Sequence, residues 1–222
     1  MKKIIIALMA LSVTLTAFAQ TPKELAKERK ETAKLSKSEL NSKATKAARK
    51  EAKKMQKEGW TIAPGSLPVD KQLDKSYLMQ YEYDENAYPR FIMAEAMSVG
   101  ENYDGARIQA TELAKLNLAG QIQSEITALV ESTVASQQLS AEEAATVSKS
   151  IIASKNTISQ NLGRVIPVVE VYRTLKNKNK EVLVRLAYNF EMAKEVTKKA
   201  IRKDLESQGE ELHGKLDKLT DW

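Results

Sequence analysis

Two neighbouring β-strand patterns constrain the fold of this 222-residue chain more than any other feature. The segments Val165–Leu175 and Glu181–Tyr188 flank a polar turn, Asn177–Lys180. In the second segment Val182, Val184, Leu186 and Tyr188 alternate with Glu181, Leu183, Arg185 and Ala187. A period of two indicates a half-buried strand, and a polar turn between two such runs predicts a β-hairpin. Pro167 is tolerated best near the start of a strand or on a sheet edge.

Helical patterns surround the hairpin. Apolar residues recur every 3.6 residues from Ala106 to about Ser136, after a cap at Asn102 or Asp104. The motif Ser140-Ala-Glu-Glu is a capping box, which predicts a second helix.

That second helix is expected to run to about Leu162–Gly163, and a last helix to run from near Phe190 to about Gly209. Arg90–Val99 has the length of a further strand. The sequence therefore predicts an α+β fold with a β-α-α-β-β-α body, in which helices pack on one face of a small antiparallel sheet.

The expected elements divide the chain into five segments. They are a signal peptide (residues 1–19), a basic helical arm (20–58), a connector with a loop and a short helix at Asp70–Tyr83 (59–90), the α+β domain (91–208) and a charged C-terminal tail (209–222).

The first residues follow the pattern of a secretory signal peptide. Lys2 and Lys3 precede the apolar run Ile4–Leu15, and Ala17-Phe18-Ala19 fits a cleavage site after Ala19. A retained membrane anchor is the alternative, but the apolar run is shorter than the roughly 20 residues of a membrane span. No second long apolar run follows, so we expect a periplasmic or secreted protein with no transmembrane span in the mature chain.

The absence of cysteine bears on both anchoring and chemistry. A bacterial lipoprotein carries its acyl chains on a cysteine directly after the signal peptide, where this chain has Gln20, so no lipid anchor is expected. Disulfides, thiolate nucleophiles and thiolate-bound metals are excluded as well.

The positive charge is concentrated in the arm. Thr21–Glu58 holds 13 basic and 6 acidic residues, whereas Gly59–Trp222 holds 20 basic and 23 acidic residues. Thr21-Pro22 favours a helix start, and the few, small apolar residues indicate an exposed helix. We expect the arm to contact an envelope protein or an anionic envelope surface. The alternative is a solvated helix without a specific role. The export signal disfavours nucleic acid as a partner.

No catalytic, cofactor-binding or metal-binding residue is predicted. The single histidine, His213, lies in the charged tail and is interpreted as an exposed bystander. Glu170 and Arg185 are expected to form a structural pair across the hairpin. Glu142 and Glu143 are explained by helix capping.

The remaining polar motifs lack the context that their chemistry requires. Gly100 and Leu162–Gly163 do not have the spacing of a phosphate-binding loop. Ser66 lacks the surroundings of a nucleophile elbow. The sequence therefore predicts a protein that is not an enzyme.

Four of the seven tyrosines lie close together in the sequence, at Tyr77, Tyr81, Tyr83 and Tyr88. Such a cluster can bind sugars or peptides, but a spacing of four residues on a helix favours a packed face.

Several segments of the body carry a resemblance to a known family. They are Ala106–Ala114, Ala119–Ile122, the Ser154-Lys155 region, Val169–Arg173 and Glu181–Tyr188. Over roughly Phe91–Leu205 the chain resembles secreted proteins of Bacteroides-type bacteria whose domain is similar to the small outer-membrane lipoprotein family of Helicobacter and to a domain of the flagellar protein FlgT. The resemblance implies an envelope location and a non-catalytic, assembly-type role. It does not carry membrane anchoring over, because the lipoprotein members use an N-terminal cysteine.

These patterns together favour an exported, non-enzymatic cell-envelope protein of the structural or interaction type. The alternative is a periplasmic protein that binds a small ligand or glycan through the tyrosine-rich region Tyr77–Tyr88. The sequence leaves the oligomeric state open.

Overall fold

The computed structural model describes Lys27, Lys30 and residues 42–63, 65–85, 87–135 and 140–207. The chain divides into two units, residues 1–43 and 44–222. In the first unit Lys27 and Lys30 are helical. The predicted signal peptide, the tail 209–222 and most of the arm before Ser42 lie outside the described residues.

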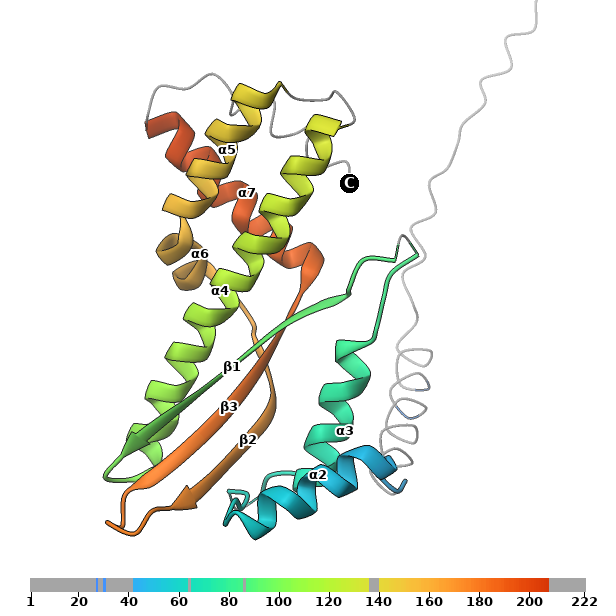
Figure 1. Ribbon diagram of the computed structural model, residues 1–222, viewed down its shortest axis with the longest axis vertical. Helices are drawn as coiled ribbons and strands as arrows, with labels where there is room; N and C mark the ends of the chain where they lie inside the picture. The colour runs from blue at the N-terminus through green and yellow to red at the C-terminus, as the bar shows by residue number, and fades with distance from the viewer. Residues whose placement is uncertain are drawn as a thin grey trace, which may run out of the picture. The chain divides into compact units, whose positions relative to one another are not determined.

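A three-stranded antiparallel sheet in the order β1-β3-β2 lies at the centre of the second unit (Figure 1). The strands are β1 (Phe91–Gly100), β2 (Ile166–Thr174) and β3 (Lys180–Asn189). β2 and β3 form the predicted hairpin, and β1 pairs with the whole length of β3. Pro167 is the second residue of the edge strand β2, at a register shift before Val169. The three predicted strands and the α+β class are confirmed.

Four helices follow the predicted pattern with one difference. They are α4 (Tyr103–Ala135), α5 (Ala141–Ala153), α6 (Lys155–Asn161) and α7 (Phe190–Ser207). Asn102 caps α4, because its Oδ1 accepts the Gly105 N–H at 2.8 Å. The second predicted helix is divided into α5 and α6 at Ser154, which ends one helix and begins the next with ψ near 3°. The body is therefore β-α-α-α-β-β-α.

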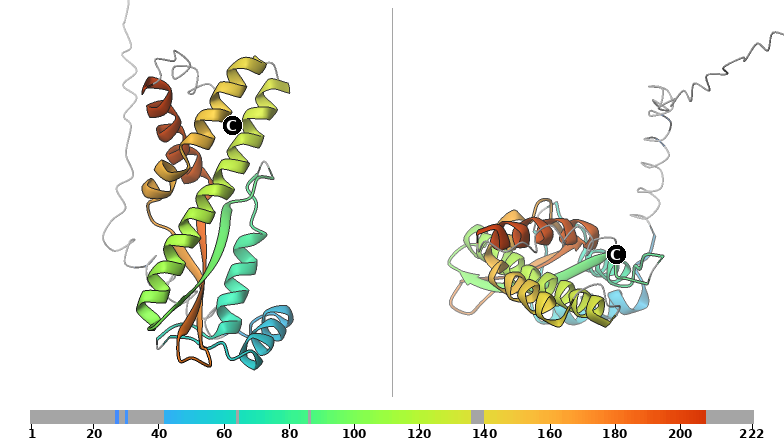
Figure 2. Two further views of the ribbon diagram at one scale, coloured as in Figure 1. Left: turned by 60° about the vertical axis from the view of Figure 1, so that its left-hand side comes forward. Right: turned by 90° about the horizontal axis from the view of Figure 1, so that it is seen from above.

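Helix α4 covers one face of the sheet and continues beyond it. Ala106, Ala110 and Ala114, four residues apart, are fully buried. Alanines at this spacing let the helix backbone approach the sheet, and the apolar even-numbered residues of β3 pack in the same core. Past the end of the sheet α4 lies beside α5, and α6 and α7 complete a helical layer (Figure 2).

The second face of the sheet is partly covered too, which corrects the expectation that helices pack on one face only. α3 (Val69–Gln80) and α2 (Lys46–Lys57) form a smaller core with Trp60 and β2. The physical reason is that Val169 and Val171 present a second apolar face of β2, which Leu73 of α3 covers. Over β1 this face stays open, with Met97 54% and Val99 45% exposed.

The prediction of an exposed arm is wrong for the residues from Ala44 onward. Ala44, Ala48 and Ala52 are at most 4% exposed and belong to the smaller core. α2 is thus part of the second unit, and the unit boundary lies before Ala44 and not at Glu58.

Candidate functional site

Helix α2 is fixed to the body by its small residues. Its two buried alanines, Ala48 and Ala52, are four residues apart and lie on one face of the helix, and Ala44, just before the helix, is buried as well. Thr45 caps the helix: its hydroxyl accepts the Ala48 N–H at 3.3 Å, and its own N–H donates to Asp74 Oδ1 of α3 at 3.0 Å. The cap therefore holds the start of α2 against α3.

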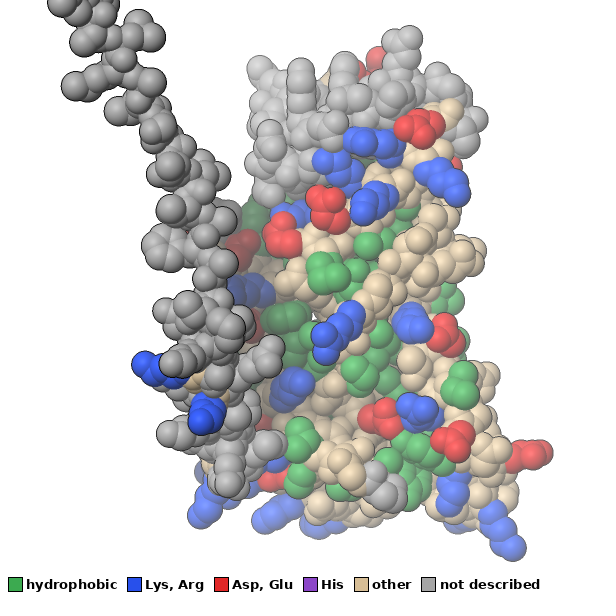
Figure 3. Space-filling model, turned by 180° about the vertical axis from the view of Figure 1, so that it is seen from behind, with side chains coloured by type: hydrophobic (Ala, Val, Ile, Leu, Met, Phe, Trp, Pro, Cys, Tyr) green, Lys and Arg blue, Asp and Glu red, His purple; other side chains and the backbone are tan. Residues whose placement is uncertain are grey.

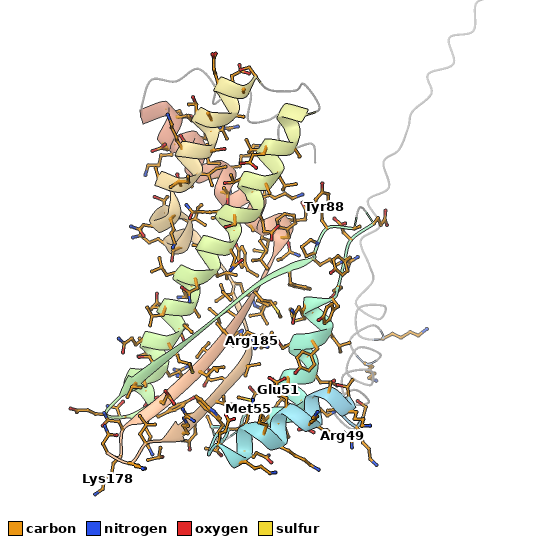
Figure 4. All side chains as sticks on the ribbon, viewed as in Figure 1. Arg49, Glu51, Met55, Tyr88, Lys178 and Arg185 are labelled. Atoms are coloured by element: carbon orange, nitrogen blue, oxygen red, sulfur yellow. The ribbon has the colours of Figure 1, made fainter. Side chains whose placement is uncertain are left out.

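The opposite side of α2 is basic. We define the basic face as the exposed residues Lys46, Arg49, Lys50, Lys53, Lys54 and Lys57. In the part of the chain that the structure describes, none of these six side chains forms an ion pair. Lysines of the β2–β3 turn, among them Lys178, lie at the same end of the second unit as Arg49 (Figure 4). Seen from behind, Lys and Arg side chains lie along this end, and others lie over the helices at the opposite end (Figure 3).

The acidic residue of α2 is engaged in packing. Glu51 accepts a hydrogen bond from the Tyr77 hydroxyl of α3. Burial of the phenol, followed by this hydrogen bond and the charge of the carboxylate, raises the pKa of Tyr77 to about 12. Glu51 therefore joins α2 to α3 and is directed away from the basic face.

The chain after α2 adds a second attachment. Gly59, with φ of +87°, lets the chain turn at the end of the helix. Trp60 is then buried, and the Arg173 guanidinium of β2 lies 4.6 Å from its ring centroid. Arg173 is also paired with Glu181 of β3. The orientation of α2 is thus set at both ends.

A groove of about 780 Å³ lies between α2, α3 and the sheet. Met55, Leu73, Met97 and Leu183 are among its apolar lining residues, and Lys50 and Lys54 line it from α2. In Figure 4, Glu51 and Met55 of α2 lie on one side of this groove and Arg185 of β3 on the other. We call it the α2 groove.

Arg185 is held in place at the floor of the α2 groove. Its Nε and Nη2 donate to Glu95 Oε2 of β1 at 2.9 and 2.7 Å, and its Nη1 donates to Ser76 Oγ of α3 at 3.0 Å. The pair joins β1, β3 and α3.

The predicted pair of Glu170 with Arg185 is wrong. The register places Val169 opposite Arg185 and Glu170 opposite Val184, so the two side chains lie on opposite faces of the sheet. Glu170 instead accepts a hydrogen bond from the Tyr103 hydroxyl of α4. Burial, followed by the hydrogen bond with Glu170, raises the pKa of Tyr103 above its ordinary value.

The four neighbouring tyrosines do not form a common site. Tyr81, Tyr83 and Tyr88 are 69%, 53% and 39% exposed. Tyr77 is packed, as its helical spacing predicted, and lines the α2 groove. Tyr81 does not share this packing.

The other residues that the sequence analysis considered for a functional role either have a structural role or lie outside the described residues. Glu143 completes the capping box, since its Oε2 accepts the Ser140 N–H at 3.0 Å. A Cβ at Gly100 would lie 3.0 Å from the Ala106 N, so this glycine serves a tight turn. The backbone N–H of Ser66 donates to Ala63 O in a turn. His213 lies outside the described residues, and the described ranges contain no group of three His, Cys, Asp or Glu side chains that could hold a metal ion.

A second groove, of about 760 Å³, runs between β1 and α4. We call it the β1 groove. Phe91 and Met93 line it from β1, Asn117, Gln121 and Ser124 from α4, and Lys155 from α6. It shares Glu95 and Arg185 with the α2 groove.

Sequence reasoning missed the rigid attachment of α2. The signal was present, because Ala44, Ala48 and Ala52 repeat at helical spacing. A stripe of alanines is a weaker signal than the fuller apolar stripe that is typical of a core-facing helix. No comparable signal in the sequence predicts that β1 has an open edge, because the pattern of one strand does not show the order of the strands in the sheet.

Comparison of the chain with models of protein families, with curated proteins and with solved structures finds no match in any of the three. Among the helices of the described ranges, none is long and apolar enough to cross a membrane.

Proposed function

We propose that the protein is an exported, non-enzymatic cell-envelope protein that acts by binding, and that the basic face of α2 contacts an anionic surface of the envelope. One observation carries the proposal: six exposed basic side chains project from a helix that the buried Ala48 and Ala52 fix to the body. Within the described residues these cations have no acidic partner to neutralise them.

Electrostatics support this use of the helix. A basic residue near an anionic membrane surface contributes about 1 kcal/mol to binding. Because α2 is anchored, the cost of ordering its backbone is met by folding and not by binding. The signal-peptide pattern of residues 1–19 supports delivery to the envelope.

The test compares two triple variants with the same change in charge. Lys46→Gln, Lys53→Gln and Lys57→Gln remove three cations of the basic face. Lys149→Gln, Lys199→Gln and Lys203→Gln remove three exposed lysines of α5 and α7. Co-sedimentation of each full chain with vesicles of phosphatidylglycerol and phosphatidylcholine, at increasing salt, measures the affinity.

The wild type and the α5/α7 variant should bind the anionic vesicles, less tightly as salt rises. The α2 variant should bind about 100-fold more weakly, which corresponds to about 1 kcal/mol for each lysine. Equal losses in both variants, or no binding by the wild type, would contradict the proposal. Fractionation of cells tests the location separately, and a purely cytoplasmic protein would contradict export.

The alternative of a small-ligand or glycan-binding protein has less support. It requires the tyrosines of Tyr77–Tyr88 to surround one pocket, but three of them are exposed and Tyr77 alone of the four lines either of the two grooves described above.

A further inference from the structure

The two edges of the sheet differ in how their backbone groups are satisfied. On the β2 edge, Tyr172 and Thr61 exchange two backbone hydrogen bonds of 2.8 and 2.9 Å. The Glu170 N–H donates to the Gln72 side-chain oxygen at 2.7 Å. Pro167 and the register shift beside it further disrupt this edge. These are the devices by which natural sheets protect an edge from pairing.

The β1 edge has little of this protection. β1 has ten residues, no proline and one charged residue, Glu95. The Glu95 carbonyl accepts a hydrogen bond from the Asn117 side chain at 2.9 Å, so it points away from β3. In an antiparallel pair such outward groups recur on every second residue. Phe91, Met93, Met97 and Val99 therefore also turn their N–H and C=O groups outward, and within the described residues no hydrogen bond from outside the sheet reaches these groups.

Space for another chain exists beside this edge. The β1 groove runs along Phe91–Glu95 and is bounded by polar side chains of α4. A neighbouring strand lies about 4.8 Å away in the hydrogen-bonding direction. At Gly120 the helix has no side chain, and the Lys155 ammonium lies 3.4 Å from the place of a Cβ.

The charges and apolar residues beside the edge indicate what kind of chain would fit. Lys155 is half-buried in the β1 groove, and in the described part of the protein it has no ion pair. Glu125 also lines this groove but is exposed. On the other face of β1, Met97 and Val99 are exposed, and the one charged residue beside them, Glu95, is already paired with Arg185. An added strand would thus meet a cation on one face and apolar side chains on the other.

We propose that β1 accepts an extended polypeptide segment of a partner protein as a fourth strand of the sheet. Its apolar side chains would lie beside Met97 and Val99, and acidic side chains that alternate with them would face Lys155. Backbone hydrogen bonds give such strand addition its affinity, and the alternating side chains give its specificity. This inference goes beyond the proposed function and does not depend on the basic face of α2.

The experiment uses the full chain and a labelled peptide of about nine residues in which glutamate alternates with valine, a length that suits one strand. Fluorescence polarisation measures its Kd. Met97→Pro removes an outward N–H but none of the hydrogen bonds to β3, as proline on an edge strand does. Met97→Ala is the control for the lost side chain, and a thermal melt checks that each variant folds.

Met97→Pro should weaken binding at least tenfold more than Met97→Ala. Lys155→Gln should weaken binding of the glutamate peptide about fivefold, and it should leave binding of a glutamine–valine peptide unchanged. The Lys46→Gln, Lys53→Gln, Lys57→Gln variant should bind the peptide within about twofold of wild type, so failure here is separate from failure of the proposed function.

Peptides with methylated amides test the wild type directly and do not depend on the folding of a variant. Methylation of one alternate set of peptide amides should abolish binding, and methylation of the other set should not, because only one set faces β1. Equal effects of the two sets would overturn the proposal, as would absence of binding at millimolar peptide. A dimer of the full chain that Met97→Pro dissociates would also overturn it, because the occupant would then be a second copy of the chain.

Discussion

Two tyrosine–carboxylate pairs join helices to the body from opposite sides of the sheet. Tyr77 of α3 donates to Glu51 of α2, and Tyr103 of α4 donates to Glu170 of β2. Each pair spans elements that are distant in sequence. Both tyrosines have a raised pKa, chiefly because their hydroxyls are withdrawn from water. The two pairs therefore make the packing of these helices sensitive to alkaline pH.

A comparison of the wild type with Tyr77→Phe should show this sensitivity to alkaline pH. The native pKa of Tyr77, about 12, lies above the ordinary value of 10.0, so the unfolded chain loses this proton first as pH rises. The contribution of Tyr77 to stability is therefore complete below pH 10 and is lost as pH rises through about 12. Urea unfolding at pH 8 and pH 11 should show a smaller difference between wild type and Tyr77→Phe at pH 11. The exposed Tyr81 provides the control Tyr81→Phe, and a difference independent of pH would contradict the assignment.

At this scale the sequence predicts local contacts and misses distant ones. The caps at Asn102 and Ser140 were predictable because each involves residues three positions apart. The partners of Glu170 and Arg185 were not, since the register after Pro167 decides which face each side chain occupies.

Two glycines of the α4 region show how the packing of one element depends on its neighbours. Gly120 lies within α4 and faces only the flexible end of Lys155. Gly100 ends β1, and a Cβ at this position would lie against the backbone of Ala106 at the start of α4. The first position therefore tolerates a methyl group, whereas the second does not.

Gly120→Ala should stabilise the protein by about 0.5–1 kcal/mol, the usual gain for alanine over glycine inside a helix. Gly100→Ala should destabilise it by about 1–3 kcal/mol, because the new Cβ would lie 3.0 Å from the Ala106 N. Chemical unfolding of both variants measures the two free energies. Effects of the same sign would show that the contacts at these glycines do not decide the outcome.

Periodicity explains why most elements were predictable. The alternation in β3 and the 3.6-residue repeat of α4 report the two faces of each element directly. The division of α5 from α6 at Ser154 carries no such signal, because the apolar repeat continues through it to Ile158.

The second unit has two principal cores, one on each side of the sheet. The larger core contains α4 and α7, and the smaller core contains α2, α3 and Trp60. The charge distribution that located the candidate site could be predicted from the sequence. The fixed position of α2 could not be predicted, because it depends on how α2 packs against α3 and β2.

Truncated chains test where the boundary between the two units lies. A chain that begins at Ser42 keeps the smaller core and should unfold at the same denaturant concentration as the full chain. A chain that begins at Gly59 loses Ala44, Ala48 and Ala52, and each buried methyl group contributes about 0.8 kcal/mol. It should be less stable by at least about 2 kcal/mol. Equal stability of the two truncated chains would mean that α2 is not part of the folded unit.

The pairing of β1 with β3 also sets an order of events in synthesis. β1 is complete once Gly100 has been made, but its partner ends at Asn189. At about 5–20 residues per second, roughly 5–20 s pass before the partner emerges. During that interval β1 has two unpaired edges, while α4 can already form from local contacts. β1, whose edge is open in the folded protein, is thus also the strand that stays unpaired longest in the nascent chain. If synthesis stalls, aggregation of the nascent chain should begin at β1.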